Sequence, residues 1–242
     1  MEDPYLKFLE QSVRRRGEWR SHLITCFLRH GRIAAAAFEI GELARFGAWC
    51  DRASRRQKLA AKRFVTRETL WDELAIPALR KCNKILVAEF GVASGVGARW
   101  WLGRLTSPSL VYRGFDTFLG MPVEFKGVPK GGLSLGGKPP NIQDNRIFWH
   151  MGDVCSTVLD VNWSELYEGR IFIFDLDLYH PSLKVWDTIA PHFSKGDLIY
   201  FDEAYNEDEF RLIRERVEHN QSIEILGFTA YSLICRVVTG KA

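Results

Sequence analysis

The spacing of hydrophobic residues changes part-way along the chain. Over its first third, apolar residues recur every three or four positions, as they do on one face of an amphipathic helix. This spacing predicts helices within 18–62, separated at Gly31, Gly41 and Gly47, and a further helix over 66–80. Beyond that helix, short continuous apolar runs predict buried strands.

The second part of the chain alternates between strands and helices. The predicted strands cover residues 84–91, 110–116, 146–153, 170–177, 197–203, 222–228 and 230–238. Helices are expected over 95–105 and 181–193 and after Asn206, which forms a capping-box-like start with Glu209. A very short connection predicts that the last two strands are antiparallel. The order predicts an α/β fold with a doubly wound, mostly parallel seven-stranded sheet, one antiparallel strand and an N-terminal helical extension.

Charge divides the chain in a similar place. Residues 1–67 contain 15 Lys and Arg against 7 Asp and Glu, a net charge of +8, whereas the remainder carries −5 and the whole chain +3. We therefore expect a basic helical extension over 1–65 and a main domain over 66–242. Basic and apolar residues alternate at helical spacing, which favours a solvated helix face over a phosphate-binding surface.

Signals for membranes and export are missing from the sequence. Uncharged apolar runs reach roughly six residues, and a membrane helix needs roughly 18, so no membrane span is expected. The first ten residues have no apolar stretch behind a basic patch, which predicts no secretory signal. Five widely spaced cysteines without a C-x-x-C pair favour a reducing, cytoplasmic setting.

A long loop rich in glycine and proline covers residues 121–145. Loops of this length inside a compact domain are either disordered or functional. Its position directly after the second strand favours a lid over a binding site.

Glycines and acids cluster where strands end, and ligands of open α/β sheets bind there. Gly91 and Gly95 follow the first strand and allow a ligand to approach the backbone. Their spacing matches neither a Walker loop nor the G-x-G-x-x-G fingerprint. Asp116 ends the second strand, where a carboxylate can bind both hydroxyls of a ribose. An adenosine-containing ligand is expected, whose adenine could lie at Asp153, although an ordinary turn explains that residue nearly as well.

A second group of carboxylates suggests metal binding. Asp175 and Asp177 alternate with apolar residues, and the period of a strand would place both on one face. Asp202 and Glu203 end the neighbouring strand. Converging carboxylates are costly unless a cation or protons neutralise them, and a divalent ion with oxygen ligands is the simplest solution. The alternative, helix capping, is weakened because Asn206 already caps the next helix.

Several segments together resemble one family. They are EFGVASGVG, GFDTFLGMP, KPPNIQDNRIFWHMGDVCSTVL, FDLDLYHPS and KGDLIYFDEAYN. In order and spacing they resemble the macrocin O-methyltransferase family of class I S-adenosylmethionine-dependent methyltransferases, closely from about 80 to 206 and loosely over 64–238. The resemblance implies a Rossmann-like fold and methyl transfer from S-adenosylmethionine to a hydroxyl of a sugar or sugar-bearing small molecule. Residues 1–60 resemble nothing in the family.

The resemblance also implies roles for individual residues. The implied cofactor-binding residues are Glu89, Gly91, Ser94, Gly95, Asp116, Thr117, Asp153 and Asp175, and the implied magnesium ligands are Asp175, Asp202 and Glu203. Asp177 is the implied base at the accepting hydroxyl, with His180 and His150 as further candidates. The family usually has a second aspartate at the position of Glu203, whose longer side chain can still ligate through oxygen.

The resemblance implies a small-molecule partner, no nucleic acid, and a homo-oligomer. Two other classes of function stay open. A nucleic-acid methyltransferase would hold phosphate with the basic extension, but the acidic strand ends and the lack of an Asn/Asp-Pro-Pro-Tyr motif count against it. A non-catalytic cofactor-binding or scaffold protein would keep the glycine turn and Asp116 without turnover.

Overall fold

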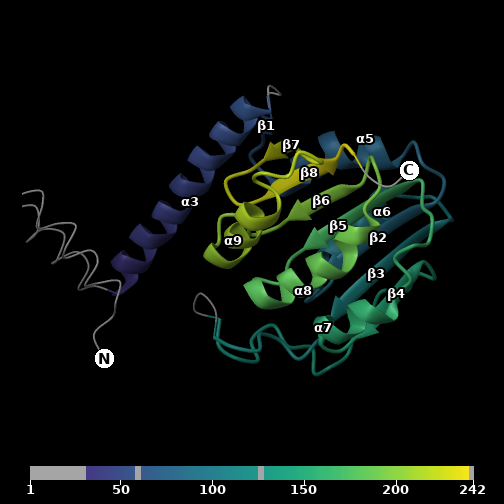
Figure 1. The fold of residues 1–242 in the computed structure, drawn as a ribbon. Coiled ribbons are helices and arrows are strands. Elements are labelled where there is room, and N and C mark those ends of the chain that lie inside the picture. Colours follow the sequence, from purple (N-terminus) through teal and green to yellow (C-terminus); the bar gives the residue numbers. More distant parts are fainter. Residues whose placement is uncertain (1–30, 58–60, 125–127, 240–242) are drawn as a thin grey trace, which may run out of the picture. The chain divides into compact units, whose positions relative to one another are not determined.

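The computed structural model describes residues 31–57, 61–124 and 128–239, so the start of the helices expected from residue 18 lies outside the described residues. The chain divides into two compact units, Met1–Arg45 and Phe46–Ala242. Helix α3 (Gly31–Arg56) contributes residues to both. The second unit contains the sheet (Figure 1).

The sheet has eight strands in the order β1-β7-β8-β6-β5-β2-β3-β4. They are β1 (Lys62–Arg63), β2 (Ile85–Phe90), β3 (Leu110–Asp116), β4 (Ile147–Met151), β5 (Gly169–Phe174), β6 (Leu198–Phe201), β7 (Ile223–Phe228) and β8 (Leu233–Val237). Only β8 runs against its neighbours, β6 and β7. The mostly parallel sheet with one reversed strand is therefore confirmed. The additional strand, β1, is an edge strand of two residues and is too short to give a hydrophobic pattern.

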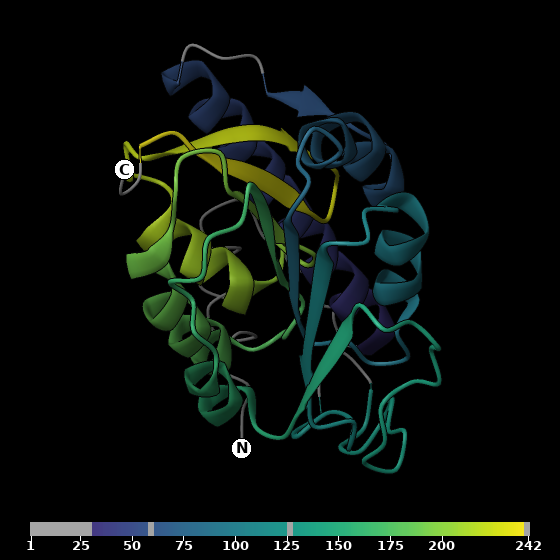
Figure 2. The ribbon, with the colours of Figure 1, turned by 90° about the vertical axis from the view of Figure 1, so that its right-hand side faces the viewer.

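Helices cover both faces of the sheet (Figures 1 and 2). They are α4 (Arg67–Leu70), the π-helix η1 (Trp71–Ala75), α5 (Ile76–Leu79), α6 (Val96–Arg104), α7 (Val154–Thr157), η2 (Val158–Asp160), α8 (Tyr179–Ile189), η3 (Ala190–His192) and α9 (Glu207–Arg216). Val87 packs on one face with Trp71 and Trp101. On the other, Phe174 lies 6.0 Å from Trp186 of α8, centroid to centroid. Alternate residues of each strand point to opposite faces. Because helices cover both faces, the central strands β2, β5 and β6 are buried along their length and mostly apolar.

Helix α3 runs without interruption for 26 residues, so the breaks predicted at Gly41 and Gly47 are wrong. A glycine inside a helix costs only about 1 kcal/mol, and neither glycine meets a close neighbour that would force the chain to bend. Burial in the second unit offsets this cost. Phe46 and Trp49 are buried and lie edge-on to Phe210 of α9, with ring centroids 6.0 and 5.8 Å apart. No helix in the described part of the chain is long and apolar enough to cross a membrane.

The helix predicted over 66–80 is present but irregular. The Thr66 side chain caps it by accepting a hydrogen bond from the Thr69 N–H. The Thr69 side chain in turn accepts one from the Thr66 N–H. The helix then passes through the π-helical turn η1, where the Ile76 N–H donates to the Trp71 carbonyl. Pro77 has no N–H, so the α-helical ladder cannot continue regularly at this point.

A buried ion pair joins the amino ends of β5 and β6. Arg170 Nε and Nη2 lie 2.9 and 2.5 Å from the two carboxylate oxygens of Asp197, and both residues are 4% exposed. The His192 carbonyl accepts a further Arg170 hydrogen bond, and the Ser194 N–H donates to Asp197. The pair is thus bidentate and its remaining hydrogen-bonding groups are satisfied.

Arg170→Met should lower the free energy of unfolding by about 3–5 kcal/mol, because it leaves the Asp197 carboxylate buried without its partner. Arg214→Met is the matched control, since Arg214 pairs with Glu218 at 3.9 Å and its side chain is 60% exposed. That change should cost less than about 1 kcal/mol. Urea denaturation measures both, and equal losses would contradict a structural role for the Arg170–Asp197 pair.

Candidate functional site

A cavity of about 650 Å³ opens at the carboxyl ends of the parallel strands. Ligand pockets commonly have volumes of about 300–1,000 Å³. The cavity is lined by residues at or just after the ends of β2, β3, β4, β5 and β6, namely Gly91, Asp116, Asp153, Asp175 and Glu203. After β4 the chain crosses to the other side of β2, which places the topological switch between β2 and β5. Open α/β sheets bind ligands at this point.

The turn after β2 brings the backbone close to the cavity. Gly91 has φ +89°, and a Cβ there would collide with the Asp175 carbonyl oxygen. Gly95, with φ +75°, is the N-cap of α6, and a side chain there would strike Pro140 of the long loop. Both positions therefore require glycine for conformation as well as space.

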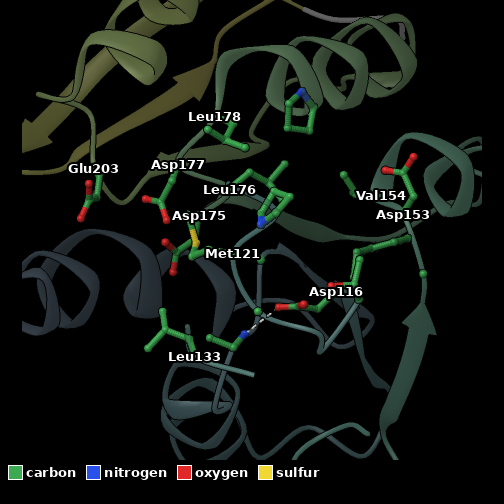
Figure 3. A pocket seen from close by; sticks show the side chains of 18 residues that line it. Asp116, Met121, Leu133, Asp153, Val154, Asp175, Leu176, Asp177, Leu178 and Glu203 are labelled. Carbon is green, nitrogen blue, oxygen red and sulfur yellow. Dashed lines mark hydrogen bonds between the residues drawn. The ribbon is translucent and has the colours of Figure 1, made fainter. Parts of the chain in front are cut away.

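Asp116 fastens this turn to β3. One carboxylate oxygen accepts the N–H groups of Val92 and Ala93, each at 2.8 Å, and the other accepts that of Phe118 at 2.7 Å. A carboxylate oxygen can accept two hydrogen bonds, so the oxygen facing Phe118 can also accept one from a ligand hydroxyl. Thr117 lies beside it on the cavity wall. Asp153 caps α7 and also lines the cavity (Figure 3).

The opposite wall is acidic and contains Asp175, Asp177 and Glu203 (Figure 3). The strand predicted to reach residue 177 ends at Phe174, so strand alternation does not orient the first two acids. Asp177 instead has φ +60°, a left-handed conformation that costs a non-glycine residue roughly 1–2 kcal/mol. The Asn206 side chain donates to its carbonyl at 3.2 Å. A held, strained turn therefore places Asp177 on the cavity wall.

The first turn of α9 supports this turn from behind. Asn206 caps α9, as predicted, by accepting the Asp208 N–H. Asp208 accepts the N–H of Tyr179 at 3.1 Å, so α8 begins at Tyr179, two residues before the predicted Pro181. The capping box expected at Glu209 is absent, because the Asn206 N–H donates to the Glu203 carbonyl at 2.8 Å and the Glu209 carboxyl is fully buried.

Burial changes the charge state of three acids. It raises the pKa of Glu89, Asp175 and Glu209 well above their ordinary values, and repulsion from neighbouring carboxylates raises each pKa further. Asp202 repels all three, and Asp177 repels Asp175 and Glu209. Their neutral forms are favoured, which removes negative charge from this edge of the sheet.

The predicted magnesium site does not fit the structure. One oxygen of Asp202 lies 2.8 Å from Arg67 Nη1, and the other accepts the Tyr200 hydroxyl at 2.6 Å. Asp202 does not line the cavity that contains Asp175 and Glu203. Among the residues that the structure describes, no three or more His, Cys, Asp or Glu side chains are grouped to hold a metal ion. Asp175, Asp202 and Glu203 therefore do not share one wall of the cavity, because Asp202 is paired with Arg67.

Several other predicted site residues lie away from the cavity lining. Glu89 is buried within β2, Gly95 is buried at the start of α6, and Ser94 is exposed. The exposed His180, in the first turn of α8, is not among the lining residues. The structure thus brings together Asp116, Thr117, Asp153, Asp175, Asp177, Gly91 and Glu203 from the predicted set.

The further base candidate His150 is engaged elsewhere. Its ring stacks on Phe115 with centroids 4.3 Å apart, and its Nε2 lies 3.2 Å from Arg113 Nη1. Burial and the nearby arginine lower its pKa. The ring thus packs against the neighbouring strand β3, and His150 is not among the residues that line the cavity.

Sequence reasoning missed the apolar part of the cavity. Met121, Leu133, Leu176 and Leu178 line it, but their pattern does not differ from that of core or loop residues. It also missed Arg67, whose only sequence signal was its position at the start of a predicted helix.

Comparison with known proteins gives a likeness among solved structures. No family model matches the chain, and no curated protein matches it. The crystal structure of CalS11, described as a calicheamicin methyltransferase, is 22% identical over 71% of this chain and 80% of that one, with a TM-score of 0.54. The chain has the fold of the class I S-adenosylmethionine-dependent methyltransferases. The Rossmann-like prediction is confirmed, and at this identity the likeness shows the fold alone.

Two more distant likenesses have TM-scores below 0.5. The apo structure of CalS11, described as a TDP-rhamnose 3'-O-methyltransferase, is 24% identical over 71% of this chain and 81% of that one, with a TM-score of 0.48. The O-methyltransferase NovP is 14% identical over 84% of this chain and 99% of that one, with a TM-score of 0.46.

Gly91→Ala should lower the free energy of unfolding by at least about 2 kcal/mol, because the new methyl group strikes backbone and the positive φ is strained. Gly103→Ala is the control. Gly103 lies in α6 with open space around it, so alanine should stabilise the protein by about 0.5–1 kcal/mol. Urea denaturation compares them, and effects of the same sign would contradict the tight turn.

Glu209→Gln should change how stability depends on pH. Because the folded-state pKa of Glu209 is raised, the unfolded chain loses this proton first as pH rises. The free energy of unfolding then falls, by up to about 1.4 kcal/mol per pH unit, until pH passes the folded-state pKa. Glutamine does not titrate, so the variant should lack this decline and be the more stable protein at the upper end of this interval.

Glu215→Gln, on the same helix, is the control with opposite sign. Hydrogen bonds from Tyr179 and Arg211 lower the pKa of Glu215 in the folded protein. Its contribution to the free energy of unfolding is therefore present above the pKa that Glu215 has in the unfolded chain, and it is lost as the pH falls through the folded-state pKa. Urea denaturation at a series of pH values measures both variants. Curves for Glu209→Gln and wild type that stay parallel would show that Glu209 titrates normally.

Proposed function

We propose that the protein is an S-adenosylmethionine-dependent O-methyltransferase that acts on a hydroxyl of a sugar or sugar-bearing small molecule. The proposal depends most on one observation. A single cavity joins a glycine turn and Asp116, which suit an adenosine-containing ligand, to a wall that carries Asp177. The methyltransferase fold supports the same activity.

The residues present fit S-adenosylmethionine. Gly91 leaves backbone exposed to the cavity where any side chain would collide, and Asp116 can accept a hydrogen bond from a ribose hydroxyl. Asp153 would lie toward the adenine, and Gly91 and Asp175 toward the methionine end. The cofactor supplies a methyl group on positively charged sulfur, a charge that the acidic wall favours.

Asp177 would act on the acceptor. A neutral hydroxyl is a poor nucleophile, so its proton must leave as it attacks. In the proposed step the acceptor oxygen bonds to the methyl carbon, the carbon–sulfur bond breaks, and Asp177 takes the hydroxyl proton. The Asn206 hydrogen bond holds the backbone of Asp177, which would help to align its side chain with the acceptor. Asp177 acts without a metal ion in this proposal, because Asp202 is engaged by Arg67.

The long loop would contribute to acceptor binding. Met121, Pro122 and Leu133 line the cavity from the segment predicted to form a lid. Apolar side chains can cover one face of a sugar ring or an attached apolar group while the acids meet hydroxyls. In the proposed cycle residues 121–145 close over the ligands and exclude water. The carbohydrate activity described for CalS11 is consistent with this acceptor class.

Asp177→Asn should leave the affinity for S-adenosylhomocysteine unchanged and reduce methyl transfer by about 10²–10⁴-fold, because the amide cannot take the proton. Asparagine tolerates the left-handed conformation, so the variant should fold. Calorimetry gives the affinity. Labelled S-adenosylmethionine added to an extract of the source cells, followed by mass spectrometry, gives the transfer and the acceptor.

Asp187→Asn is the control, since Asp187 is exposed on α8 and pairs with Arg216. It should match wild type in both assays. Near-normal transfer by Asp177→Asn would move the base elsewhere. A wild type that binds neither S-adenosylmethionine nor its product would refute the function, and binding without transfer to any acceptor would indicate a non-catalytic protein.

A further inference from the structure

Carboxyl groups are concentrated at this edge of the sheet. Glu89 lies near the end of β2, Asp175 directly follows β5, Asp202 directly follows β6, and Glu209 lies in the first turn of α9. Repulsion from Asp202 contributes to the raised pKa of each of the other three. Charges of one sign at this density require compensation. Burial raises the pKa of these three acids and so favours their neutral forms, whereas Asp202 has a positive partner.

That partner is the Arg67 guanidinium. Its Nη1 lies 2.8 Å from Asp202 Oδ2, and the Tyr200 hydroxyl donates to Oδ1 at 2.6 Å. The Asp202 side chain is 15% exposed and that of Arg67 34%. This partial shielding from water makes the attraction stronger than in an exposed pair. Both oxygens of Asp202 are thus held by groups of the chain itself.

Arg67 is fixed in place by its surroundings. It is the first residue of α4, directly after the Thr66 cap, so its backbone position is set by the helix start. Its guanidinium lies 5.3 Å from the centre of the Trp71 ring, and that ring lies 5.2 Å from Tyr200. Arg67, Trp71, Tyr200 and Asp202 therefore form one connected group between the first helix of the domain and the end of β6.

We propose that Arg67 is a positioning residue that neutralises and orients Asp202 in place of a divalent metal ion, so that the site works without a metal. A guanidinium is permanently charged and can donate along two directions to a carboxylate. It neutralises Asp202 and directs that carboxylate away from the cavity, which leaves Asp177 and Glu203 to meet the acceptor. The proposal rests on the proposed function for its catalytic consequence, but the pairing itself can be tested separately.

The first test compares Arg67→Met with Arg104→Met. Arg104 is a close match, because it also pairs with an aspartate, Asp72 at 3.2 Å, and lies 5.4 Å from the Trp100 ring centre, but on an exposed surface. Arg67→Met should raise the unfolding equilibrium constant about tenfold or more, as loss of a hydrogen bond to a charged group does. Arg104→Met should change it much less. Equal effects would overturn the positioning role.

A double-mutant cycle with Asp202→Asn tests whether the stability lost in Arg67→Met depends on Asp202. If Arg67 acts through Asp202, adding Arg67→Met to Asp202→Asn should cost clearly less than Arg67→Met alone. Costs that simply add would overturn the pairing. Arg67→Lys keeps the charge and should recover part of the loss, and it serves in place of Arg67→Met if that variant fails to fold.

Magnesium chloride and a chelator test the replacement of the metal. The melting midpoint of the wild type should be the same with millimolar magnesium chloride and with EDTA. Arg67→Met, with an uncompensated acidic cluster, should melt at a higher temperature in magnesium, as expected of a protein stabilised by a bound ion. A wild type that magnesium stabilises as strongly as the variant would overturn the proposal.

Turnover completes the test. Wild-type methyl transfer to the acceptor found in the extract should be unchanged in EDTA, and a loss restored by magnesium would overturn the proposal. S-adenosylhomocysteine calorimetry separates the two proposals. A wild type without affinity for the cofactor or its product would remove the proposed function, while the double-mutant cycle and the magnesium-dependent melting would still decide the role of Arg67.

Discussion

Electrostatic repulsion among carboxylates at one edge of the sheet is the constraint on which the arrangement of the site depends. Parallel strands end together, so acids near the ends of β2, β5 and β6 gather whatever their separation in sequence. The structure answers this in two ways. Glu89 and Glu209 are buried and Asp175 is half-buried, so the neutral forms of all three are favoured, and Asp202 is paired with Arg67. Asp177 and Glu203 are then the acids presented to the cavity beside Asp175.

Segments that are distant in sequence hold the turns that form the cavity walls. Helix α4 supplies Arg67, and the first turn of α9 supplies Asn206 and Asp208, which hold the backbone on either side of the Asp177 turn. Asp116 in turn fastens the glycine loop to β3. The cavity walls are therefore fixed by side chain to backbone hydrogen bonds at strand ends, where the ladder of the sheet no longer constrains the chain.

The sheet could be predicted from sequence because buried parallel strands are continuous apolar runs. The end of β3 could also be predicted, at Asp116, but the end of β5 could not. β5 stops at Phe174, so Asp175 and Asp177 reach the cavity through a turn and not through strand alternation. Glu209 has the spacing of a capping box but is buried. The local sequence shows which residues are polar, but the fold decides which partner each polar group meets. Arg67 and Asp202 are paired although they lie 135 residues apart in the chain.

The Arg67–Asp202 pair has a consequence for regioselectivity. A metal ion with open coordination positions can select an acceptor by chelating two adjacent oxygens, whereas a guanidinium that already holds an aspartate offers no such position. If the protein methylates a hydroxyl as proposed, the choice among acceptor hydroxyls would depend on the apolar wall, which Met121, Pro122 and Leu133 contribute, and on the reach of Asp177. In that case, changes in the loop sequence would redirect the methyl group to another oxygen without any change in the residues proposed to perform the chemistry.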